Sequence, residues 1–142
     1  MRCAVVGCGP VGRFLGARLG VEPLHRDQWP LGQVDLVFLA VPDRCIADQA
    51  ARLRQAGDWA LVHCSGATPR AALGDGASAV WHPMRAFAAD AQPPTDLANC
   101  VVGLRGDAAL LAWLESQTQA WGGQPVMVDE EQAIRVHAAC CF

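Results

Sequence analysis

The chain contains neither lysine nor tyrosine. All 11 basic residues among its 142 residues are arginine. Lysine ammonium groups and tyrosine hydroxyls are therefore excluded as acids or bases within this polypeptide. Any acid–base catalysis by this chain must use a histidine, a carboxylate, a thiol or a bound water molecule.

The sequence also lacks the cysteine spacing of a disulfide framework or a zinc site. Its seven cysteines are an odd number, and no two of them form a CxxC pair. We expect most of these thiols to be small buried apolar groups in a reduced compartment. The same inert role is expected for Cys8, in a glycine-rich turn, and for Cys140 and Cys141, although their positions make redox chemistry the alternative. No metal site is predicted.

Neither an excess of positive charge nor a long apolar run is present. The formal net charge is −3, and 52% of the residues are hydrophobic. Without a basic surface we expect no nucleic-acid partner, and without about 20 consecutive apolar residues we expect no membrane span. The apolar N-terminus is broken by glycine, unlike a signal peptide, so a cytoplasmic location is the default expectation. The length suits one domain.

A short apolar strand over residues 2–6 runs directly into a glycine-rich turn and then into a helical pattern. In a dinucleotide-binding turn the first glycine reverses the chain, the second lets the backbone approach a pyrophosphate, and the third lets the helix pack on the strand. A structural tight turn is the alternative, but the strand before and the amphipathic helix after it favour nucleotide binding. The predicted pyrophosphate site consists of Gly7, Gly9, Pro10, Val11 and Gly12.

Apolar runs alternate with helical patterns along the rest of the chain. The expected strands cover residues 2–6, 21–25, 35–41, 59–63, 79–82, 100–104 and 126–128. Helices are expected after the glycine turn and at residues 43–56, 69–73, 107–121 and 129–139, the last beginning with a capping box of Asp129 and Gln132. The alternation predicts an α/β fold, a doubly wound, mostly parallel Rossmann-like sheet with flanking helices. Residues 1–128 form the expected dinucleotide-binding domain, and residues 129–142 begin a helical segment.

Two further turns are expected to contact the cofactor, because ligands bind beyond the carboxyl ends of the strands in such sheets. Arg26 follows the second expected strand, where an arginine suits a ribose 2′-phosphate, while the adjacent Asp27 would suit a free 2′-hydroxyl. The cofactor is therefore expected to be NADP, with NAD as the alternative. Val41 and Pro42 would pass close to the ribose and pyrophosphate, and Asp43 is expected to cap the following helix rather than bind directly.

A candidate catalytic pair follows the next two strands. Ser65 comes after the strand at residues 59–63, and His82 ends the strand at residues 79–82. Adjacent parallel strands bring their carboxyl ends to one edge of the sheet, so we expect the two side chains to lie close together. A hydroxyl can bind a substrate oxygen, and an imidazole can accept or donate a proton near neutral pH. A structural role for both residues is the alternative.

Four strings make the sequence recognisable: AVPD at 40–43, VHCSGA at 62–67, WHPMRAF at 81–87 and VHAACCF at 136–142. They resemble a bacterial family of uncharacterised proteins that join a Rossmann-like NADP-binding domain to a helical domain of unknown function 2520. The resemblance implies kinship with the six-phosphogluconate dehydrogenase-like group. That group includes pyrroline-carboxylate reductases, F420-dependent NADP oxidoreductases and prephenate dehydrogenases.

Prephenate dehydrogenases are the nearest chemical analogy that the resemblance offers. They also place a serine after one strand and an HPM motif after the next, and their HPM histidine bonds the substrate hydroxyl. Carried over, this makes His82 the candidate base and Ser65 its helper, although Arg85-Ala86-Phe87 follows here without the glycine of those enzymes. Relatives continue past the segment matching residues 137–139 into a helical domain that usually forms a dimer. We therefore expect much of that domain to be missing from this chain.

The resemblance leaves three functions open. The first is hydride transfer between NADP and a small carbonyl, imine or alcohol. A non-catalytic dinucleotide-binding or sensor module is the second, and an F420-dependent NADP oxidoreductase-like protein is the third. The last helix is expected to expose Ile134, Ala138 and Cys141 unless it packs on the sheet or on a second subunit, so a homodimer through it is a candidate. His137 is expected to pack, or to reach the cofactor site in an assembled dimer.

Overall fold

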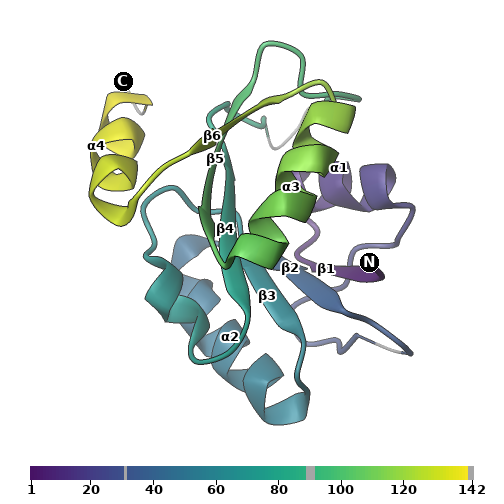
Figure 1. Ribbon diagram of the computed structural model, residues 1–142. Helices are drawn as coiled ribbons and strands as arrows, with labels where there is room; N and C mark the ends of the chain where they lie inside the picture. The colour runs from purple at the N-terminus through teal and green to yellow at the C-terminus, as the bar shows by residue number, and fades with distance from the viewer. Residues whose placement is uncertain (31, 89–91, 141–142) are drawn as a thin grey trace.

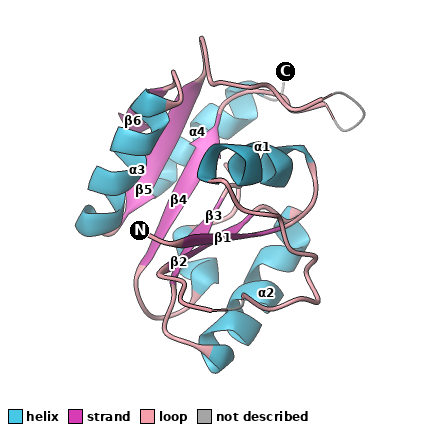
Figure 2. Cartoon of the chain, turned by 90° about the vertical axis from the view of Figure 1, so that its right-hand side faces the viewer, coloured by secondary structure: helices cyan, strands magenta, loops and turns pink. Residues whose placement is uncertain are grey.

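The computed structural model describes residues 1–30, 32–88 and 92–140, which form a six-stranded sheet between helices (Figures 1 and 2). The strands lie in the order β1-β2-β3-β4-β5-β6, and β5 is antiparallel to β4 while all other neighbours are parallel. The predicted α/β, mostly parallel Rossmann-like fold is therefore confirmed. The elements are β1 (Cys3–Val6), α1 (Pro10–Leu19), β2 (Leu36–Leu39), α2 (Asp43–Ala56), β3 (Ala60–His63), η1 (Arg70–Leu73), β4 (Ser78–Pro83), β5 (Val101–Gly106), α3 (Ala108–Ala120), β6 (Gln124–Met127) and α4 (Glu130–Cys140).

The strand predicted at residues 21–25 is wrong. Leu24 forms only an isolated parallel bridge with Val6, in which its N–H donates to the Val5 carbonyl and its carbonyl accepts from Gly7. Pro23 has no N–H with which to extend this ladder. The chain then turns over residues 25–28, where the Gln28 N–H bonds the His25 carbonyl. The segment therefore delivers Arg26 from a turn rather than from the end of a strand.

The helices cover both faces of the sheet, as expected of a doubly wound fold. On one face α1 and α3 pack against an aromatic cluster in which the Trp81 ring lies 6.4 Å from Phe14 and 6.0 Å from Trp121. On the other face α2 contributes Ile46 and other apolar side chains to a second cluster. All four residues of β2 are buried, which explains its continuous apolar sequence.

Polar groups define the start of the C-terminal helix α4. The predicted capping box is present: the Gln132 N–H donates to the Asp129 carboxylate at 2.7 Å, and the Asp129 N–H donates to the Gln132 side chain at 3.2 Å. Helix α4 stands at one side of the sheet, away from α1 and α3 (Figure 1). Ile134 is 64% exposed and Ala138 is also exposed, as predicted, while Cys141 lies outside the described residues.

The expectation that most thiols are buried is wrong for the described cysteines, since Cys3, Cys45 and Cys64 are only partly buried. Cys100 is buried and Cys8 is exposed, so not every thiol is a core group. Within the described ranges, no helix combines the length and apolarity needed to cross a membrane. The same part of the chain contains no cluster of three or more metal-ligating side chains.

Candidate functional site

The glycine turn is shaped by two close backbone approaches. Gly7 has φ +120°, and a Cβ there would lie 2.0 Å from the Ala40 carbonyl oxygen. A Cβ on Gly12 would lie 1.8 Å from the Gly7 carbonyl oxygen. No real Cβ tolerates either distance, so any other residue would displace β1 from β2 or α1 from the turn. The first and third glycines thus have the structural roles predicted for them.

Gly9 differs from both, because nothing lies within 4 Å of the position that its Cβ would occupy. It is the N-cap of α1, Pro10 follows at the first helical position, and the first turn of the helix contains no acidic residue. The positive end of the helix dipole and the free N–H groups therefore face open space. A pyrophosphate suits this arrangement in charge and hydrogen bonding.

A cavity of about 310 Å³ opens beside this turn. Gly9, Pro10 and Val11 line it from the turn, and Ser65 lines it from the end of β3. The predicted contact residues Val41 and Pro42 line it as well, as do Ala40, Asp43 and Cys64. The structure therefore brings most of the predicted cofactor residues around one space at the carboxyl ends of three strands.

Asp43 does not act as the predicted helix cap. It is the first residue of α2, the N-cap is Pro42, and no side-chain capping hydrogen bond forms. Its carboxylate is exposed in the first turn of the helix, where the helix dipole favours a negative charge. Asp43 thus contributes an exposed carboxylate to the lining of the cavity.

Arg26 lies outside the residues that line the cavity but is held against the start of α2. Its carbonyl accepts a hydrogen bond of 2.9 Å from the Gln49 side chain, which fixes the turn on the helix. The guanidinium lies 3.9 Å from the Cys45 sulfur, two residues beyond Asp43. Asp27 is exposed. Arg26 is therefore an exposed residue beside the first turn of α2.

Ser65 is positioned by its own loop. Its Oγ accepts hydrogen bonds from the N–H groups of Ala67 at 3.2 Å and Thr68 at 3.0 Å. Its N–H donates to Nδ1 of His63, at 3.1 Å. Because the two lone pairs of Oγ already accept, the hydroxyl hydrogen is the group left for a ligand.

His63 supports this loop from the core. It is fully buried, and burial lowers its pKa to about 4, an effect that the nearby Pro69 carbonyl opposes. The imidazole is therefore neutral at neutral pH. Since Nδ1 accepts from Ser65, the proton resides on Nε2, for which the described residues offer no well-aligned acceptor. His63 is therefore a structural histidine that supports the Ser65 loop.

His82 lies beside the same loop, as predicted from the neighbouring strands. Its Nδ1 bonds the Cys64 carbonyl at 3.2 Å, and because a carbonyl only accepts, Nδ1 carries the proton and Nε2 keeps a lone pair. Burial is the largest cause that lowers the pKa of His82. His82 is not among the residues that line the cavity beside the glycine turn. Nε2 faces Gly66 instead, since a Cβ there would lie 2.5 Å from it.

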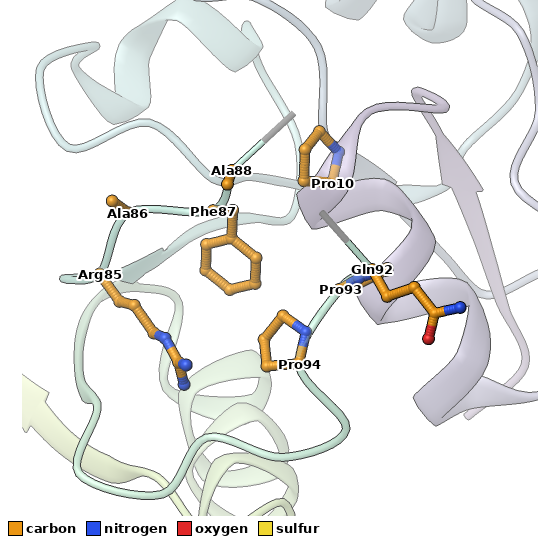
Figure 3. Close-up of a pocket in the computed structure, with 8 residues that line it drawn as sticks. All are labelled: Pro10, Arg85, Ala86, Phe87, Ala88, Gln92, Pro93 and Pro94. Carbon is orange, nitrogen blue, oxygen red and sulfur yellow. The ribbon is translucent and has the colours of Figure 1, made fainter. Parts of the chain in front are cut away.

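A second cavity of about 220 Å³ (Figure 3) has Pro10 in common with the first. Its walls come from the loop after β4 and are mainly apolar, with Phe87, Pro93 and Pro94 among them. Arg85 is the one charged side chain among its described lining residues. The Arg85 and Phe87 side chains extend in the same direction, while Gln92 points away from them (Figure 3). The described residues 85–88 and 92–94 thus lie beside the start of α1.

Sequence reasoning missed two features of the site. It assigned no role to Arg85, although the HPM motif directly precedes this residue. It also did not identify the packing partner of His137, which lies beside His82 within the same chain, with 5.8 Å between the ring centres. Only the position of α4 relative to β4 reveals that pair.

Solved structures share this fold. Protein TM1727 from Thermotoga maritima has a TM-score of 0.75 and 24% identity, over 97% of this chain and 61% of its own. BF3122 from Bacteroides fragilis, described as a candidate NADP oxidoreductase, has a TM-score of 0.82 and 16% identity, over 99% and 65%. Prephenate dehydrogenase from Aquifex aeolicus, solved with hydroxyphenyl propionate and NAD+, has a TM-score of 0.75 and 16% identity, over 94% and 62%.

These identities show a common fold and no more. The chain spans less than two thirds of the length of each of the three solved proteins. No protein-family model and no curated protein matches the sequence significantly. The resemblance to the family with the domain of unknown function 2520 therefore stays a prediction, and the fold established for this chain is the Rossmann-like fold of NAD(P)-dependent dehydrogenases and reductases.

Proposed function

We propose that this chain is the dinucleotide-binding part of an NADP-dependent oxidoreductase. The observation that carries the proposal is the open space at Gly9, at the acid-free N-terminus of α1 and on the wall of a cavity of about 310 Å³. A merely structural turn needs glycine at positions 7 and 12 but has no need of it at position 9. NAD- and NADP-linked proteins among the solved structures with this fold support the same assignment.

The residues divide into those that hold the cofactor and those that hold the substrate. The N–H groups at the start of α1 would bind the pyrophosphate, and Val41, Pro42 and Asp43 would border the ribose. Bound NADP supplies a nicotinamide that accepts or donates hydride. The second cavity is lined by neither Ser65 nor His82, so the small substrate would lie on the Ser65 side of the first cavity, next to the cofactor.

Ser65 and His82 have complementary hydrogen-bonding states. The Ser65 hydroxyl can donate to a substrate oxygen, because its lone pairs accept from the backbone. His82 is the candidate base, since Nε2 has a free lone pair and burial favours the neutral imidazole. Because the chain has no lysine or tyrosine, the role of acid or base falls to other side chains, and these two are our candidates.

Arg26 supports NADP over NAD. Its guanidinium is directed toward the first turn of α2, and a 2′-phosphate there could accept from N–H groups that the Cys45 sulfur leaves free. Arg26→Ala should weaken NADPH binding by about 1–3 kcal/mol and leave NADH binding nearly unchanged. Equal weakening of both cofactors in a fluorescence titration would contradict the phosphate role.

Catalysis is tested by turnover of a panel of alcohols, carbonyl compounds and imines with NADP. If the panel yields a substrate, His82→Asn should lower kcat/KM by about 100-fold or more, and Ser65→Ala by a smaller factor. His25→Asn, which changes an imidazole outside the cavity, is the matched control and should leave turnover unchanged. Unchanged turnover in His82→Asn would remove the proposed base. Binding of NADPH with no turnover across the panel would favour the non-catalytic binding module.

A further inference from the structure

Gln49 is a buried polar side chain on the inner side of α2. It is 8% exposed, and it lies three positions after Ile46 and four before Leu53, which both belong to the apolar core. A buried amide needs hydrogen-bond partners to offset the loss of water. The Gln49 amide nitrogen finds one in the Arg26 carbonyl, at 2.9 Å. Gln49 therefore ties the turn that contains Arg26 to the helix.

This turn, residues 25–28, is also closed on itself. The Gln28 N–H donates to the His25 carbonyl at 2.9 Å, and the His25 N–H donates to the Gln28 side chain at 2.7 Å. The peptide between Arg26 and Asp27 is the centre of the turn, and its atoms lie in one plane. The bond from Gln49 to the carbonyl of this peptide therefore restricts the directions in which the Arg26 and Asp27 side chains leave the turn.

The two side chains differ in what they contact. The Arg26 guanidinium lies 3.9 Å from the sulfur of Cys45, which precedes Gln49 by one helical turn on the same face of α2. The guanidinium thus reaches from the anchor at Gln49 toward the end of α2 at which Asp43 lines the first cavity. Asp27 is exposed and forms no hydrogen bond or ion pair with the part of the chain that the structure describes. The anchored turn therefore places the cation, rather than the carboxylate, along the helix.

Arg52 gives the same turn a second attachment to α2. Its guanidinium donates to the Arg26 carbonyl at 3.4 Å and lies 5.1 Å from the centre of the ring of Trp29, the residue directly after the turn. The hydrogen bond is long, and both Arg52 and Trp29 are exposed to water. This attachment is therefore weaker than the shorter bond from the buried Gln49.

We propose that Gln49 is a positioning residue for cofactor selectivity, which acts by holding Arg26 in place for the 2′-phosphate of NADP. The inference deepens the proposed function and rests on it. A guanidinium on a held turn loses less conformational freedom when it binds a phosphate than one on a free turn. NADH carries a hydroxyl in place of this phosphate, so the anchor contributes little to its binding. Gln49 itself does not line the cavity and acts through Arg26.

Fluorescence titration of the full chain with NADPH and with NADH measures this preference without a substrate. Gln49→Met removes the hydrogen-bond donor and retains the length of the side chain. It should weaken NADPH binding by about 3–10-fold and leave NADH binding nearly unchanged. Gln55→Met, the same change at an exposed position of α2, is the matched control and should alter neither affinity.

A double variant separates positioning from a merely structural role. In an Arg26→Ala background, Gln49→Met should cause no further loss of NADPH affinity, because the guanidinium that it positions is gone. A structural role would weaken both cofactors in either background. Arg52→Ala, at an exposed position, should weaken NADPH binding by about 2–3-fold, and it decides the role of the anchored turn if Gln49→Met does not fold.

Two results would overturn the inference and leave the proposed function standing. One is a wild-type preference for NADPH that persists undiminished in Gln49→Met, or in Arg52→Ala where that variant decides. The other is an equal loss of NADPH and NADH affinity in Gln49→Met. Absence of binding of either cofactor by wild type would reject the proposed function and the inference with it, so the two failures are distinguishable.

Discussion

The glycine turn and the C-terminal helix reach the same edge of the sheet by different physical means. The turn is fixed by backbone sterics, since Cβ atoms at Gly7 and Gly12 would overlap nearby backbone carbonyl oxygens. Helix α4 is fixed by charged and polar groups, above all Glu130 between Arg70 and Arg105. The strand and helix that flank the turn contribute Val5 and Phe14 to the apolar core, whereas α4 exposes Ile134 to solvent.

This difference concerns how firmly each region is held in place. A rigid turn presents the same N–H groups in every copy of the protein, which suits the recognition of a phosphate. A helix held by a few polar contacts can move more readily, because local stability follows local burial. We therefore expect cofactor binding to depend on the core and the His82–His137 pair to depend on the anchor of α4.

The largest effect is expected from Gly12→Ala. The new methyl group would lie 1.8 Å from the Gly7 carbonyl oxygen, so α1 must move away from β1. The free energy of unfolding should fall by about 3 kcal/mol or more in urea denaturation. Gly20→Ala, at the open C-terminal end of the same helix with φ +68°, should cost only about 1 kcal/mol. Equal losses would mean that the turn is not sterically fixed.

The next largest effect is the pH dependence of the free energy of unfolding that the buried His63 causes. Its pKa in the folded protein is about 4, below the usual value of 6.5, so the unfolded chain binds more protons between these values. Stability should be full above pH 6.5 and should fall by about 2 kcal/mol as the pH decreases toward 4.5. His63→Asn, whose amide oxygen can still accept from the Ser65 N–H, should flatten this profile in urea denaturation. An unchanged slope would exclude His63 as the cause.

A smaller global effect is expected at the anchor of α4. Glu130→Ala leaves the buried Arg105 guanidinium with the Thr68 carbonyl but without its carboxylate. Stability should fall by about 1–2 kcal/mol, because Glu130 itself is half exposed. Hydrogen exchange should rise in α4 and stay unchanged in α1. Faster exchange in both helices would show that the two regions are not independent.

The sequence predicted the glycine turn at residues 7–12 far better than the contact between His82 and His137. Glycine spacing, an apolar strand before it and a helical pattern after it are all local, so the turn could be located from residues 2–19 alone. The prediction of a strand around Leu24 failed because Pro23 limits this segment to one β-bridge. The antiparallel pairing of β4 with β5 and the approach of His137 to His82 depend on long-range packing, which no local pattern records.

The central claim is that Gly9 is open because a dinucleotide pyrophosphate binds there. Titration of the chain with NADPH, followed by NADPH fluorescence, tests it most directly when wild type and Gly9→Ala are compared. We predict saturable binding by wild type and at least about tenfold weaker binding by Gly9→Ala, with stability changed by less than about 1 kcal/mol, since nothing lies within 4 Å of the new methyl group. Absence of NADPH and NADH binding at millimolar concentration, or equal affinity in both proteins, would contradict the account.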